Sequence, residues 1–154
     1  MIVEDSMKTI YNTSDVLKVL DLEWGRLRTW IKSGFFIPMI PPKGQGRAFE
    51  FTLWDIYALA IFKKLIDGGI SRWSAGKSIE ILPKLMKTRW DGKKPLFISV
   101  KVSEESHNTS IEEPSWLVKS WINDEENTNW DRILIINFQT LKKSVDNKLK
   151  ELEE

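Results

Sequence analysis

Five basic side chains in one stretch of the chain have the types and spacing that suit a defined chemistry. Arg26, Arg28 and Lys32 fall in a segment with helical spacing, and Lys43 and Arg47 follow among glycines. A helix fits the major groove of DNA, and an arginine can grip a phosphate or the edge of a guanine. Any one of these charges alone is most often an ordinary solvated residue, but their clustering predicts a DNA-binding surface.

Two short helices are expected to position the first of these residues. Asn12, with Asp15 three positions later, forms a capping box for a helix of about Thr13–Leu20. After a tight connection, apolar positions at helical spacing predict a second helix of about residues 23–33, which Gly34 ends.

A hairpin is expected next, over about residues 37–51. Prolines and glycines forbid a helix there, and the alternation of Phe49 and Phe51 indicates the return strand. Thr52 and Asp55 then form a second capping box, which predicts a third helix running to the glycine pair after residue 67.

A fourth helix and then a region of different composition follow the third helix. Ser71 is expected to cap a helix of about Arg72–Met86, and Pro83 to kink or shorten it. Residues 95–102 and 132–139 are rich in β-branched and aromatic residues and are predicted strands, with a polar loop between them.

The tail, Thr140–Glu154, carries an apolar stripe at helical spacing, formed by Leu141, Val145, Leu149 and Leu152. Because an isolated helix of this length is marginal, the stripe should pack on the two strands or against a second subunit. We expect a homodimer, since a two-fold DNA-binding protein reads two half-sites.

The N-terminal part of the chain resembles a known family. The stretch "YNTSDVLKVLDLEWGRLRTWIKSGFFIP", continued by "RAFEFTLWDIYALAIFKKLIDGGISRWSAGKSI", is similar to MerR-type winged helix-turn-helix regulators over about residues 10–86. The resemblance implies an α+β protein. An N-terminal winged helix-turn-helix domain of four helices and a hairpin wing, about 8–86, would precede a small α+β region, about 90–154, ending in a helix.

The resemblance also implies roles for individual residues. Arg28 matches the recognition-helix arginine, Trp30 an aromatic beside it, and Lys63 a lysine that can meet phosphate. Thr29 stands where the family prefers an aromatic, and Phe49 takes the usual wing-arginine position. The predicted DNA-binding residues are Arg26, Arg28, Thr29, Trp30, Lys32, Lys43, Arg47, Lys63 and Lys64.

The expected function is that of a transcriptional regulator, without catalysis or cofactor, which binds double-stranded DNA. Residues 1–94 carry a net charge of +6 and residues 95–154 one of −5, so the front of the chain suits an anionic partner. Two alternatives remain: an excisionase-like or architectural protein that bends DNA, and a protein-interaction adaptor on the same fold.

Composition excludes several classes of site. The chain has no cysteine and a single histidine, His107, so thiolate metal sites, zinc clusters and thiol chemistry are excluded. Acidic runs lack calcium-loop spacing and indicate solvated surface. Without an export signal or an apolar run long enough for a bilayer, a cytoplasmic protein is expected.

Tryptophan is unusually common, at eight residues. Those of the C-terminal region could line a pocket for a planar effector, although tryptophan more often packs in a core or at an interface. A small-molecule or protein effector is therefore assigned to that region as an expectation, and the tryptophans concerned are Trp90, Trp116, Trp121 and Trp130.

Overall fold

In the part of the chain that the structure describes, helices and two small antiparallel sheets form a mixed α+β fold. The computed structural model describes residues 10–44, 46–89, 95–103, 106–112 and 131–154. The chain divides into two units: one is formed by the residues up to Ala60 together with Ser144–Glu154, and the other by Ile61–Lys143. We call them the first and second units; their division does not coincide with the predicted boundary between residues 86 and 90.

The first unit begins with a short strand and a capped helix. Strand β1 (Tyr11–Asn12) leads into helix α1 (Thr13–Leu20), as predicted. The Asp15 N–H donates to Asn12 Oδ1 at 2.8 Å, and the Asn12 N–H donates to the Asp15 carboxylate at 3.3 Å. This reciprocal pair satisfies two backbone donors that an open helix end would leave without partners.

Helix α2 (Trp24–Lys32) follows a short turn in which Asp21 adopts the left-handed conformation. Its apolar face, Leu27 and Trp30, is buried in the first unit. The helix stops before Gly34, whose φ of +76° is the left-handed conformation expected after a helix C-terminus. Both helices of the predicted pair are therefore confirmed.

The predicted hairpin of residues 37–51 is wrong in its pairing. Strand β2 (Glu50–Phe51) pairs antiparallel with β1, so that Phe51 faces Tyr11. The described residues between Gly34 and Glu50 form a loop without strands. Three of these residues are prolines, which lack the N–H that an outgoing strand would need to donate.

The base of this loop is fixed to helix α3 (Leu53–Asp67). The Asp55 carboxylate accepts the Thr52 N–H at 2.8 Å, which confirms the second capping box. The same carboxylate accepts the Met39 N–H at 3.1 Å, although Asp55 is only 1% exposed. One buried acid thus caps a helix and holds the loop.

Helix α6 (Phe138–Glu153) contributes its C-terminal half to the first unit. Val145 and Leu149 are buried, and the Tyr57 hydroxyl donates a hydrogen bond to the Asp146 carboxylate. Most of the apolar stripe expected on this helix is buried within the single chain, so the stripe gives no support for a dimer. The homodimer remains a prediction.

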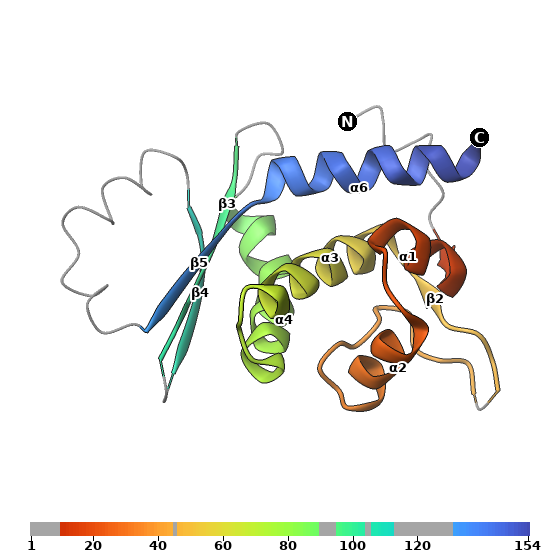
Figure 1. Cartoon of the computed structure of the whole chain (residues 1–154), viewed down its shortest axis with the longest axis horizontal. Coiled ribbons are helices and arrows are strands. Elements are labelled where there is room, and N and C mark those ends of the chain that lie inside the picture. The colour runs from red at the N-terminus through yellow and green to blue at the C-terminus, as the bar shows by residue number, and fades with distance from the viewer. Residues whose placement is uncertain (1–9, 45, 90–94, 104–105, 113–130) are drawn as a thin grey trace. The chain divides into compact units, whose positions relative to one another are not determined.

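The second unit contains helix α4 (Arg72–Arg89) and a three-stranded antiparallel sheet in the order β4-β3-β5. The strands are β3 (Phe97–Val102), β4 (His107–Glu112) and β5 (Arg132–Asn137), drawn together in Figure 1. Strand β4 lies where a loop was expected. With its partners on both sides, β3 is the central strand and buries Ile98 and Val100.

Helix α4 lies against β4 and makes a polar contact with it. The Thr109 hydroxyl donates to Ser78 Oγ at 2.7 Å, and the buried Ser78 hydroxyl donates to the Ser74 carbonyl at 2.8 Å. The helix continues through Pro83 to Arg89, so of the two expected effects of Pro83, a kink or a shortened helix, the shortening is wrong. No helix in the described ranges is long and apolar enough to cross a membrane.

Candidate functional site

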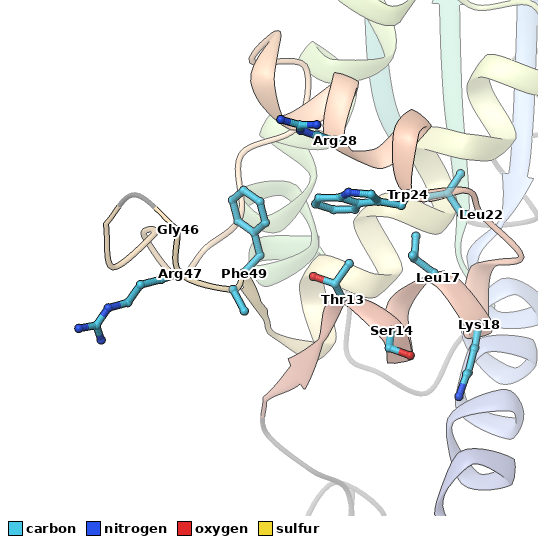
Figure 2. Close-up of a pocket in the computed structure, with 11 residues that line it drawn as sticks. Thr13, Ser14, Leu17, Lys18, Leu22, Trp24, Arg28, Gly46, Arg47 and Phe49 are labelled. Carbon is cyan, nitrogen blue, oxygen red and sulfur yellow. The ribbon is translucent and has the colours of Figure 1, made fainter.

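An open cleft of about 910 Å³ lies in the first unit, where α1, α2 and the loop before β2 meet (Figure 2). Three of the described residues that line it are cations, Lys18, Arg28 and Arg47, and none is a carboxylate. We call this hollow the basic cleft; its remaining lining is Thr13, Ser14, Leu17, Leu22, Trp24, Gly46, Ala48 and Phe49.

A row of aromatic rings leads from the core into the basic cleft. Phe51 is fully buried, and its ring centroid is 6.3 Å from that of Phe49. The Phe49 ring is in turn 6.2 Å from the Trp24 ring and tilted by 53° to it. Figure 2 shows Trp24 in the middle of the cleft with Phe49 beside it. Tilted pairs at these distances are favourable, so the row holds Trp24 in place.

One stripe of α2 is exposed to solvent, and two of its three residues, Trp24 and Arg28, line the cleft. Trp24, Arg28 and Lys32 follow each other at intervals of four residues, which puts them on one side of a helix, and all three are exposed. Arg26 lies two positions from Arg28 and therefore on a different side. Its guanidinium carbon is 5.2 Å from the centre of the Trp30 ring. The sequence-based prediction that grouped Arg26 with Arg28 on one surface is corrected here.

The predicted DNA contact of Trp30 is also corrected. Its side chain is 1% exposed and belongs to the core of the first unit. Thr29 is exposed, and its hydroxyl donates to the Gly25 carbonyl at 2.8 Å. That bond leaves the hydroxyl oxygen able to accept a further hydrogen bond.

The loop supplies the remaining cations of the first unit's basic surface. Lys43 is exposed and forms a 3.6 Å ion pair with Glu50, an arrangement that contributes little at a protein surface. Arg47 is exposed, and Figure 2 shows its side chain extending away from Trp24. From Trp24 to Phe49 the chain contains five lysines and arginines and no aspartate or glutamate. The α2 stripe and the loop thus come from a stretch of uniformly positive charge.

Lys63 and Lys64 belong to the second unit, in the C-terminal half of α3. Lys63 is half-buried and Lys64 is exposed. They do not line the basic cleft. Their predicted phosphate contacts stay predictions.

A second polar feature of the first unit is the Tyr11 hydroxyl. It is buried, and among the described side chains it lacks a hydrogen-bond partner. Burial raises the pKa of Tyr11, and the carboxylates of Glu153, Asp146 and Asp15 raise it further. A phenol in these surroundings stays neutral, so it is no candidate base.

The tryptophans proposed to line an effector pocket, Trp90, Trp116, Trp121 and Trp130, lie outside the described residues. Within the described ranges, His, Asp and Glu side chains form no group of three or more that could hold a metal ion.

Sequence reasoning missed the residues that line the cleft from α1 and the first turn of α2. Trp24 stands four positions before Arg28, a spacing that places both on one side of a helix and could have identified it. Nothing in the local pattern marks Thr13, Ser14 or Lys18, because their proximity to the loop depends on the pairing of β1 with β2.

The sequence matches no family model, and no curated protein matches it.

Proposed function

We propose that the protein binds duplex DNA and acts as a transcriptional regulator, using α1 and α2 as a helix-turn-helix and the basic loop that follows in the place of a hairpin wing. One observation carries the proposal: the basic cleft joins Lys18 of α1, Arg28 of α2 and Arg47 of the loop, and none of its described lining residues is a carboxylate. Cations gathered from three elements suit the closely spaced phosphates of a duplex.

In this proposal α2 enters the major groove with the stripe of Trp24, Arg28 and Lys32 leading. A helix is narrow enough for that groove, and an arginine can bond two acceptors of a guanine. Lys43 and Arg47 on the loop contact the sugar–phosphate backbone. Backbone contacts of this kind fix the position of a protein on DNA without selecting a sequence.

The test is to measure duplex binding by the full chain with fluorescence anisotropy, at salt concentrations from about 50 to about 200 mM. Each neutralised phosphate should contribute about −0.9 to the slope of log affinity against log salt. Arg47→Ala should weaken binding to all duplexes similarly and make the slope less steep by about 1. An unchanged slope would exclude Arg47 from the interface.

The control for net charge is a variant that, like Arg47→Ala, loses one positive charge, but at a position outside the basic cleft. Lys148→Ala is suitable, because Lys148 is exposed on α6 and does not line the basic cleft. It should leave affinity and slope unchanged. Equal effects of Lys148→Ala and Arg47→Ala would indicate a response to total charge rather than binding in the cleft.

A second candidate function, a protein-docking adaptor, is favoured by the loop itself. Ile37 and Met39 are 77% and 61% exposed on a segment whose backbone Asp55 holds. Exposed apolar side chains on a fixed backbone suit contact with another protein. Failure of the full chain to bind any duplex at low salt would favour this candidate over DNA binding.

A further inference from the structure

We propose that Trp24 reads a thymine, by packing its ring against the 5-methyl group at a position next to the base that Arg28 contacts. The inference rests on the proposed function and assigns a sequence preference to it. It depends on the place of Trp24 in α2, on the rings behind it and on its spacing from Arg28.

Trp24 is the first residue of α2, and its side chain is 39% exposed. When a helix enters the major groove, residues of its N-terminal part reach the base edges. An indole ring offers an apolar face there, with a single N–H donor. The thymine methyl is the apolar group that base pairs present in the major groove, so it is the feature that this ring complements.

The ring is held from behind rather than free to turn away. Phe49 contacts it at 6.2 Å between centroids, and Phe49 itself rests on the fully buried Phe51. A side chain supported in this way loses little conformational entropy on binding, because its position is already restricted. Phe49 is thus a positioning residue for Trp24.

The distance from Arg28 defines where the thymine should lie. Four residues of helix span about 6 Å along the axis, and base pairs are stacked about 3.4 Å apart. Trp24 and Arg28 lie on the same side of α2 and both line the basic cleft. The thymine should therefore stand one or two base pairs from the position whose preference Arg28 sets.

The experiment starts with a preferred duplex selected by the full chain from a random pool. Each thymine in turn is replaced by deoxyuridine, which removes the 5-methyl group and changes no charge or hydrogen bond. At the position read by Trp24, the unsubstituted protein should lose affinity about fourfold, the value of one buried methyl-sized group. Arg28→Ala should relax the preference one or two base pairs away.

Variants of the protein test whether the loss of affinity for the deoxyuridine duplex is due to Trp24. Trp24→Ala should bind the thymine and deoxyuridine duplexes equally, with lower affinity than the unsubstituted protein. Phe49→Ala should reduce the discrimination, and Phe49→Tyr, which keeps the ring, should retain it. Trp73→Ala removes another exposed tryptophan, on α4, and should leave the discrimination between thymine and deoxyuridine unchanged.

Two results would overturn the inference while leaving the proposed function intact. In the first, no deoxyuridine replacement weakens binding; in the second, Trp24→Ala weakens binding but keeps the full thymine preference. Circular dichroism and thermal melting of each variant separate a loss of folding from a loss of contact. If the unsubstituted protein binds no duplex at all, the proposed function fails first and the inference with it.

Discussion

Arg28 and Trp30 stand two positions apart on α2 and have opposite environments. Arg28 is exposed at the basic cleft, whereas the Trp30 ring is buried beneath the Arg26 guanidinium. Side chains two positions apart point to nearly opposite sides of a helix, so Arg28 and Trp30 cannot belong to the same DNA-contacting surface. Exposure therefore selects Arg28 for contact with a partner and assigns Trp30 to stability.

Replacing Arg28 by Ala should cost about 1–3 kcal/mol of binding free energy on the preferred duplex, and less on unrelated duplexes. The reason is that a bidentate contact to one base is lost only where that base is present. Anisotropy titrations on both duplexes measure the difference. Equal losses on every sequence would remove Arg28 from base reading.

Replacing Tyr11 by Phe should leave the free energy of unfolding unchanged or raise it by about 1 kcal/mol. The Tyr11 hydroxyl is buried without a partner among the described side chains, and such a group costs its desolvation energy on folding. Urea denaturation measures the change. Tyr57→Phe is the contrasting variant, since it removes a hydroxyl that donates to Asp146, and it should be destabilising.

At the scale of elements, one buried carboxylate serves both α3 and the loop before β2. Burial raises the pKa of the Asp55 carboxyl, whereas hydrogen bonds from Thr52 and Met39 act to lower it. A raised folded-state pKa means that the folded protein keeps a proton that the unfolded chain has already released. Stability from this group is therefore lost as pH rises from the ordinary carboxyl pKa through the raised one.

The Asp55→Asn variant should lack this pH dependence. Below the ordinary pKa of a carboxyl, the unsubstituted protein should exceed the variant in unfolding free energy by its largest margin, and the margin should shrink as pH rises. Urea denaturation of both proteins over the acidic range measures it. Asp15→Asn, at the same position of the α1 capping box, is the matched control. A margin that grows with pH would mean that the hydrogen bonds outweigh burial.

Local patterns predicted the helices well because their signals lie within a few residues of each other. Asn12 and Asp15 mark the start of α1, and Gly34 marks the end of α2. Strand β4 was missed because its sequence, "HNTSIE", is mostly polar and gains its structure from pairing with β3. The loop was assigned to a hairpin for a similar reason, since the partner of β2 precedes α1.

The candidate site was predictable in charge but only partly in geometry. Arg28, Lys32, Lys43 and Arg47 were identified from sequence and are exposed in the first unit. Their relation to Lys18 and Trp24 was not predictable, because the basic cleft forms only when three elements fold together. The helical spacing of Trp30 and Leu27 indicates that both are buried, as the structure shows. The family resemblance instead predicted that Trp30 contacts DNA.

At the scale of the whole molecule, the first unit is discontinuous in sequence. It combines the residues up to Ala60 with Ser144–Glu154, and the C-terminal half of α6 buries Val145 and Leu149 there. The helix that was expected to pack on the two strands or against a second subunit contributes its C-terminal half to the core of the first unit. Removing it should therefore affect folding before it affects any association.

A chain that stops after Lys143 should lose about 3–6 kcal/mol of stability in the first unit, since burying Val145 and Leu149 contributes about 1.5–3 kcal/mol each. That is a large part of the stability of an ordinary domain. Urea denaturation measures the loss. Leu152→Ala, at a position 37% exposed, is the milder comparison. An unchanged midpoint after truncation would show that the C-terminal half of α6 is dispensable there.

The discontinuity of the first unit also has a consequence during protein synthesis. The residues that carry α1, α2 and the loop leave the ribosome before the second unit does, but their core is complete only when Ser144–Glu154 has been made. At usual rates of translation, the delay is on the order of ten seconds. A nascent chain should therefore expose part of the apolar surface of the first unit to chaperones for that time, and acquire its mature surface only after Ser144–Glu154 has been made.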